Sequence, residues 1–177
     1  MADRKIISID GMGGDNAPRI VIEGLEVIAK THPHLDFLVH GDEAQLKPLL
    51  LKAPTAAPRV TIRHTDKSVS MDAKPSQMLR QGKGTSMWNA IESVKAGEAV
   101  AAVSAGNTGA LMALSMFILR KVEGVHRPAL VGSWPTRKGV CAMLDLGADI
   151  AADATQLVEF AIMGAAFARA ITSCKVL

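Results

Sequence analysis

The sequence has few aromatic residues: they make up 3% of the 177 residues, and tyrosine is absent. Proteins that bind single-stranded nucleic acid stack the bases on aromatic side chains, so we expect no nucleic-acid partner. Apolar residues still make up 49% of the chain and charged residues 21%, a composition typical of a folded globular protein. The core must therefore be built from aliphatic side chains and the nine methionines.

The sequence also has few cysteines, and its histidines form no recognisable catalytic motif. Cys141 and Cys174 lie far apart, and neither belongs to a Cys-x-x-Cys pair, which argues against a disulfide framework and a Cys-rich zinc site. The five histidines are scattered without metal-ligand spacing, so we expect no metal site. The sequence has no Gly-x-Ser-x-Gly motif. Neither a Ser-His-Asp nor a Cys-His set is recognisable in the sequence.

The first ten residues contain no apolar run long enough for a signal peptide, and we expect a cytoplasmic protein. The one long uncharged run covers residues 99–119. It is long enough to span a bilayer, but its centre, Ser104-Ala-Gly-Asn-Thr-Gly109, is polar and glycine-containing. We therefore predict a buried strand at 99–103, a loop, and a helix over 108–119 with Asn107 as its N-cap.

Strands and helices alternate along the first two thirds of the chain. Strands are predicted at 5–9, 35–40 and 59–63, and helices at 43–51 and after Thr85 or Ser86. Another helix follows residue 15, with Pro18 in its first turn and Val21, Leu25 and Ile28 on one face. This alternation predicts an α/β fold of three layers, α/β/α, with a largely parallel sheet.

In the last third of the chain, the pattern predicts two strands followed by one long helix. Two apolar runs, 129–134 and 140–144, favour a hairpin or two neighbouring strands. Asp153 and Gln156 resemble a capping box. The helix that follows carries one apolar stripe, made of Leu157, Phe160, Ala161, Gly164, Phe167 and Ile171.

Two glycine-containing loops follow predicted strands, where parallel sheets bind ligands. The loop Asp10-Gly-Met-Gly-Gly-Asp15 matches neither the dinucleotide fingerprint nor a Walker A loop. The loop at 104–109 offers Ser104, Asn107 and Thr108 as side-chain donors, and the N-terminus of the next helix adds free N–H groups. The second loop is therefore a candidate cradle for phosphate. The alternative for the first loop is a tight turn with a helix cap, and the alternative for the second is an N-capped helix after a buried strand.

Cationic residues supply further candidates. Lys74, Arg80 and Lys83 form a local cluster, which is either a solvated face or a surface for an anion. Arg127, in Gly124-Val-His-Arg-Pro128, is suited to bidentate phosphate contact. Asp145 closes a predicted strand in Leu144-Asp-Leu-Gly-Ala-Asp149.

Long motifs, taken in order, resemble the bacterial phosphate acyltransferase family of phospholipid synthesis. They are Ile7-Ser-Ile-Asp-Gly-Met-Gly-Gly-Asp15, Thr85-Ser-Met87, Val103-Ser-Ala-Gly-Asn-Thr-Gly-Ala-Leu-Met112, Gly124-Val-His-Arg-Pro-Ala-Leu130 and Leu144-Asp-Leu-Gly-Ala148. The resemblance covers residues 1–171 as the N-terminal α/β portion of a longer family chain, so this chain is truncated relative to the family. Residues 172–177 do not resemble its continuation.

The resemblance implies transfer of a fatty acyl group from acyl-[acyl carrier protein] to inorganic phosphate, without a metal or a cofactor. It also implies a homodimer, a fold similar to the isocitrate/isopropylmalate dehydrogenase and phosphotransacetylase group, and peripheral contact with the membrane that holds the next acyltransferase. Two alternatives stay open. The chain is a dehydrogenase of the fold-related group, or a non-catalytic fragment that only dimerises or binds carrier protein.

The resemblance also implies roles for residues of both loops. Asn107 and Thr108 are the expected catalytic residues. The expected substrate and phosphate site comprises Asp10, Gly13, Gly14, Asp15, Ser104, Gly106, Gly109 and Arg127.

Overall fold

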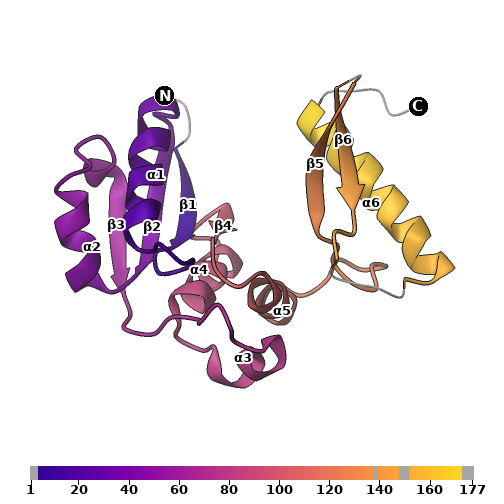
Figure 1. Ribbon diagram of the computed structural model, residues 1–177, viewed down its shortest axis with the longest axis horizontal. Helices are drawn as coiled ribbons and strands as arrows, with labels where there is room; N and C mark the ends of the chain where they lie inside the picture. Colours follow the sequence, from indigo (N-terminus) through magenta and orange to yellow (C-terminus); the bar gives the residue numbers. More distant parts are fainter. Residues whose placement is uncertain (1–3, 138, 148–151, 173–177) are drawn as a thin grey trace. The chain divides into compact units, whose positions relative to one another are not determined.

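The computed structural model describes residues 4–137, 139–147 and 152–172. The chain forms two compact units, Met1–Arg120 and Lys121–Leu177. The first contains a four-stranded sheet with helices, and the second contains a two-stranded hairpin and one long helix (Figure 1). Residues 173–177, most of the tail that we expect to depart from the family, lie outside the described residues, as does Cys174.

The sheet of the first unit is parallel throughout and has the strand order β3-β2-β1-β4. Its strands are β1 (Lys5–Asp10), β2 (Leu35–Gly41), β3 (Val60–His64) and β4 (Ala101–Val103). The chain adds β2 and β3 on one side of β1 and then returns to place β4 on the other side. The strand order therefore reverses between β1 and β4. In open parallel sheets, this switch point is where ligands bind.

Helices cover both faces of this sheet, as the predicted three-layer fold requires. Because side chains alternate along a strand, Ile9, Phe37 and Val39 face α1 (Arg19–Thr31) and α2 (Glu43–Leu50) in one core cluster. On the other face, α4 (Ser86–Lys95) packs against β1, β2 and β4. It shares a second cluster with α3 (Pro75–Gln81) and α5 (Thr108–Leu119), which contribute Met78 and Leu114. The predicted α/β fold is confirmed.

The strands and helices predicted for the first unit are present, but some of them begin or end at other residues or bury a different face. The uncharged run forms β4, a turn and α5, and at 12 residues α5 is too short to cross a bilayer. The prediction that its strand is buried is wrong: β4 lies at the edge of the sheet, and Ala101 and Val103 are exposed, Val103 by 52%. Pro18 is the N-cap of α1 rather than a residue of its first turn. The buried face of α1 is Ile22, Leu25 and Ala29, whereas Ile28 is 39% exposed. Both stripes through Leu25 have helical spacing, so the periodicity could not choose between them.

The helix caps follow the predictions, but two short elements were missed. Thr85 caps α4 by accepting a hydrogen bond from Trp88 N at 3.3 Å, and Asn107 caps α5 by accepting from Ala110 N at 2.9 Å. The sequence analysis missed α3 and the 3-10 turn Ala57–Arg59. Pro75 at the first position of α3 was an available signal for that helix.

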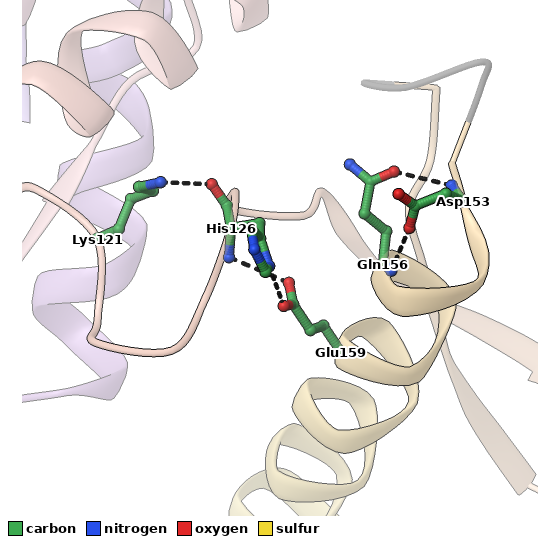
Figure 2. Close-up of polar contacts among 5 residues, drawn as sticks. All are labelled: Lys121, His126, Asp153, Gln156 and Glu159. Atoms are coloured by element: carbon green, nitrogen blue, oxygen red, sulfur yellow. Dashed lines mark hydrogen bonds and ion pairs between the residues drawn. The ribbon is translucent and has the colours of Figure 1, made fainter.

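In the second unit, β5 (Val131–Thr136) and β6 (Gly139–Leu144) form the antiparallel hairpin that was one predicted alternative. The helix α6 (Ala154–Thr172) packs on β6. Its capping box forms as predicted, with Gln156 N donating to Asp153 Oδ1 at 2.8 Å and Asp153 N donating to Gln156 Oε1 at 2.9 Å (Figure 2).

The predicted apolar stripe of α6 is only partly buried. Phe160 is buried, and a Cβ on Gly164 would lie 3.2 Å from Leu144 Cδ1, so the middle of the stripe meets the hairpin. Leu157 and Ile171 are 58% and 49% exposed, so the two ends of the stripe stay largely uncovered. By length and composition alone, the stretch Ala154–Ile171 is apolar enough to cross a membrane.

Candidate functional site

The two glycine-containing loops meet at the switch point of the sheet. Ile9 and Val103 are register partners in β1 and β4, so the residues that follow them emerge side by side. Ser104 Oγ donates a hydrogen bond to Asp10 Oδ2 at 2.7 Å, although the two residues are 94 positions apart. Gly106 N donates to Ser104 Oγ at 3.0 Å, and Met12 N donates to Asp10 Oδ1 at 3.2 Å. Asp10, 2% exposed, therefore joins both loops.

Glycine permits this close approach. A Cβ on Gly13 would lie 2.4 Å from Asp10 Oδ2 and 2.8 Å from Ser104 Oγ. A Cβ on Gly106 would lie 3.3 Å from Gly13 Cα, and Gly14 has a φ of +103°, which side chains disfavour. The tandem glycines thus have a packing role that the sequence alone did not reveal.

Asn107 connects the second loop to a third segment, residues 71–75. Its Oδ1 caps α5, and its Nδ2 donates to Met71 O at 2.6 Å and to Ala73 O at 3.0 Å. A Cβ on Gly109 would lie 2.7 Å from Pro75 Cγ, so the segment also packs on the first turn of α5. The side-chain amide of Asn107 is therefore occupied in holding the helix and this segment together. Sequence analysis missed this connection.

The first turn of α5 leaves groups that suit an anion. Leu111 N donates to Asn107 O at 2.9 Å as the helix begins, so the N–H groups of Thr108 and Gly109 precede the intrahelical ladder. The Thr108 side chain is exposed beside them. Backbone N–H groups and the helix dipole together favour negative charge at this position.

Other predicted site residues lie farther out. Asp15 is exposed at the outer end of the first loop, and Lys74, Arg80 and Lys83 are exposed in and around α3. Arg127 belongs to the second unit, and its place in the site stays a prediction.

Polar contacts within the second unit fix the segment that contains Arg127 (Figure 2). Glu159 of α6 accepts a hydrogen bond from His126 N at 3.1 Å through Oε2, and its Oε1 pairs with the His126 ring. The hydrogen bond from the His126 side chain lowers the pKa of Glu159, and the bond from the His126 backbone adds to this effect. Lys121 Nζ donates to His126 O at 2.6 Å. Sequence analysis singled out this segment but missed Glu159.

Asp145 lies where β6 ends, as predicted. Its Oδ1 accepts a hydrogen bond from Leu130 N at 2.9 Å, which holds the two ends of the hairpin together. Its Oδ2 is buried and has no hydrogen-bond partner among the residues that the structure describes.

A buried histidine lies behind the first loop and was also missed. His40, the register partner of Asp10 on β2, has its Nε2 3.1 Å from Ser8 Oγ and 3.2 Å from Ser93 Oγ. Burial, and to a lesser extent the charge of Arg63, lower the pKa of His40 to about 4. His40 also lines a cavity of about 310 Å³ together with Arg63, His64 and Glu98. The neutral ring therefore ties β1, β2 and α4 together.

Within residues 4–137, 139–147 and 152–172, no group of three or more His, Cys, Asp or Glu residues is placed to hold a metal ion.

The fold and the loops define an α/β protein whose parallel sheet carries two glycine-containing loops at its switch point. A family model described as "Fatty acid synthesis protein" matches residues 5–176. The chain therefore belongs to this family of fatty acid synthesis proteins.

Curated relatives agree with this assignment. The chain is 52% identical over 175 residues to a phosphate acyltransferase of Caulobacter vibrioides, covering 99% of this chain and 49% of the relative. It is 56% identical over 166 residues to a phosphate acyltransferase of Parvibaculum lavamentivorans, covering 93% and 46%. A third, from Paramagnetospirillum magneticum, is 53% identical over 165 residues, covering 93% and 47%. The resemblance to the phosphate acyltransferase family is confirmed, and the chain spans about half the length of these relatives.

Proposed function

We propose that this chain takes part in transferring a fatty acyl group from acyl-[acyl carrier protein] to inorganic phosphate. A phosphate oxygen attacks the thioester carbonyl, the C–S bond breaks, and the products are acyl phosphate and the free thiol of the carrier protein. The observation that carries the proposal is the meeting of the 10–15 and 104–109 loops at the switch point, beside the N-terminus of α5. The relatives' printed name, phosphate acyltransferase, supports the same reaction class.

This reaction requires no side-chain nucleophile, because phosphate is itself the nucleophile. The protein must hold an anion and stabilise the oxyanion that forms at the carbonyl. We assign phosphate binding to the Thr108 hydroxyl and to the N–H groups of Thr108 and Gly109. Asn107 then holds the first turn of α5 in place, and Asp10 with Ser104 keeps the facing loop close.

The partners follow from the same proposal. Acyl carrier protein and inorganic phosphate are the substrates. The assembly is a homodimer in the cytoplasm that contacts the membrane peripherally. The relatives' name does not favour the dehydrogenase alternative, and a titration with nicotinamide cofactor tests that alternative directly.

The test is acyl-phosphate formation by this 177-residue chain from acyl-[acyl carrier protein] and inorganic phosphate, with the product trapped by hydroxylamine. The Thr108→Ala variant should lower turnover about tenfold or more, since it removes one hydrogen-bond donor that holds the attacking phosphate. Thr155→Ala is the matched control, because Thr155 is also exposed in the first turn of a helix. No product from the unaltered chain, or equal turnover by Thr108→Ala, would contradict the proposal; the first result favours a non-catalytic fragment.

A further inference from the structure

Lys74 lies in the segment that packs against the first turn of α5. The residue before it, Ala73, accepts a hydrogen bond from Asn107 Nδ2 at 3.0 Å through its carbonyl oxygen. The residue after it, Pro75, has its Cγ 2.7 Å from the position of a Cβ built on Gly109. The backbone of Lys74 is thus bracketed by two residues that contact the second loop and the start of its helix, all within the first unit.

The backbone of Lys74 is fixed, whereas its side chain is exposed. Its carbonyl oxygen accepts a hydrogen bond from Gln77 N at 3.0 Å where α3 begins, and its side chain makes no cap hydrogen bond to that helix. None of the ion pairs among the described residues involves Lys74. The ammonium group can therefore meet a ligand, and the packing of α3 on α5 sets where its backbone lies (Figure 1).

Lys74 differs in this respect from Arg80 and Lys83, the other cations of the same cluster. Arg80 is in the last turn of α3, and Lys83 follows the end of that helix. There, a Cβ on Gly82 would lie 3.2 Å from Leu114 Cδ2, more than one turn along α5 from its first residue. The two ends of α3 therefore meet different parts of α5, and the end at Lys74 is the one that meets its first turn.

The turn itself supplies no full positive charge. No residue from 99 to 119 is charged, and backbone N–H groups with a helix dipole supply only partial charges. The charged side chain that joins the two loops is Asp10, which is buried. Both of its oxygens accept hydrogen bonds, as those of an ionised carboxylate do, and an ionised carboxylate repels an incoming anion. A cation beside the turn offsets this repulsion.

We propose that Lys74 binds the phosphate anion at the turn and supplies this positive charge. The inference rests on the proposed function, which assigns phosphate to Thr108 and Gly109. Lysine carries its charge on a flexible four-carbon stem, so Lys74 can reach inward from the segment to an anion held by the helix N-terminus. The hydrogen bond from Asn107 to the segment then has a functional consequence, because it keeps the lysine beside the turn.

The experiment measures the Kd of inorganic phosphate from the shifts of the Thr108 and Gly109 amides in the ¹⁵N-labelled 177-residue chain and its variants. Lys74→Met should raise the Kd about three- to tenfold, because it removes one charge-assisted contact. The increase should shrink as NaCl is added, because salt screens exposed charges. Lys74→Arg keeps the charge and should bind nearly as tightly as the unaltered chain.

Lys95→Met is the matched control. Lys95 is an exposed lysine in the last turn of α4, which leads to the amino end of β4, whereas the turn follows the carboxyl end of that strand. The same loss of charge there should leave the Kd unchanged. Asp72→Asn removes a negative charge from the segment of Lys74 and should keep or tighten phosphate binding.

The outcomes separate the two proposals. If the unaltered chain binds phosphate and Lys74→Met binds it as tightly, the role of Lys74 is wrong and the proposed function stands. The same conclusion follows if the loss does not change with salt, if Lys95→Met gives an equal loss, or if Asp72→Asn weakens binding. If the unaltered chain binds no phosphate, the proposed function fails and the role of Lys74 fails with it. Circular dichroism checks that each variant keeps its helices.

Discussion

At the residue scale, the site depends on glycines, which have no side chain, as well as on polar side chains. Gly13 and Gly106 let the two loops touch, so that Ser104 can reach Asp10 at 2.7 Å. The aspartate in turn accepts hydrogen bonds through both of its oxygens. This arrangement shapes the loops without using the exposed Thr108, which stays available to a ligand.

Gly13→Ala tests this reading. Its Cβ would overlap Asp10 Oδ2 at 2.4 Å, so the variant should lose about 1–3 kcal/mol of unfolding free energy through overpacking. Gly24→Ala is the control, because Gly24 is in α1 with no atom within 4 Å of a built Cβ; it should gain about 0.5–1 kcal/mol from helix propensity. Urea unfolding measures both. Equal effects of the two substitutions would show that the loops do not need a glycine at position 13.

Some residue roles were predictable from sequence and others were not. Asn107 and Thr85 were recognisable as N-caps because capping depends on local sequence. The second role of Asn107, its bonds to Met71 and Ala73, joins segments that lie far apart in the chain. Glu159 was hidden for the same reason: its partner His126 is 33 positions away.

At the element scale, packing decides what periodicity leaves open. The alternating pattern predicted the strands and helices of the parallel sheet, but not which stripe of α1 would be buried or that α3 forms. The sequence also did not predict buried polar contacts on the sheet face under α4, because Ser8 and His40 lie within otherwise apolar strands. The role of these two residues depends on Ser93 of α4, which lies within hydrogen-bond distance of the His40 ring.

This network predicts a pH dependence. The pKa of His40 is about 4 in the folded chain against an ordinary 6.5, so the unfolded state takes up a proton first as the pH falls. The stability from neutral His40 is complete above pH 6.5 and is lost between pH 6.5 and 4, by at most about 3 kcal/mol. Arg63, His64, Glu92 and Glu98 line the same cavity and contribute to its charge.

Urea unfolding at several pH values measures this loss. His40→Gln should flatten the slope of unfolding free energy between pH 6.5 and 4, while it lowers stability at pH 7. The exposed His34 provides the control, and His34→Gln should leave the slope unchanged. A slope that is the same in the unaltered chain and in His40→Gln would show that His40 titrates alike in both states.

At the scale of the whole molecule, the chain contains two units and spans about half the length of its curated relatives. The first unit holds both loops of the proposed phosphate site, and the second holds the segment that contains Arg127, whose neighbour His126 donates its backbone N–H to Glu159. The second unit also exposes apolar side chains of α6, including Val158 and Ile162 at 60% and 65%. Apolar surface of this extent is typical of a face that packs against another apolar surface.

The central claim is that the turn at the switch point holds inorganic phosphate. Its most direct test is the titration of the ¹⁵N-labelled 177-residue chain with phosphate, followed through the backbone amide resonances. We expect saturable shifts of the Thr108 and Gly109 amides, with smaller shifts in the 10–15 loop that faces them. Saturable binding that leaves these amides unshifted, or no saturable binding, would contradict the account.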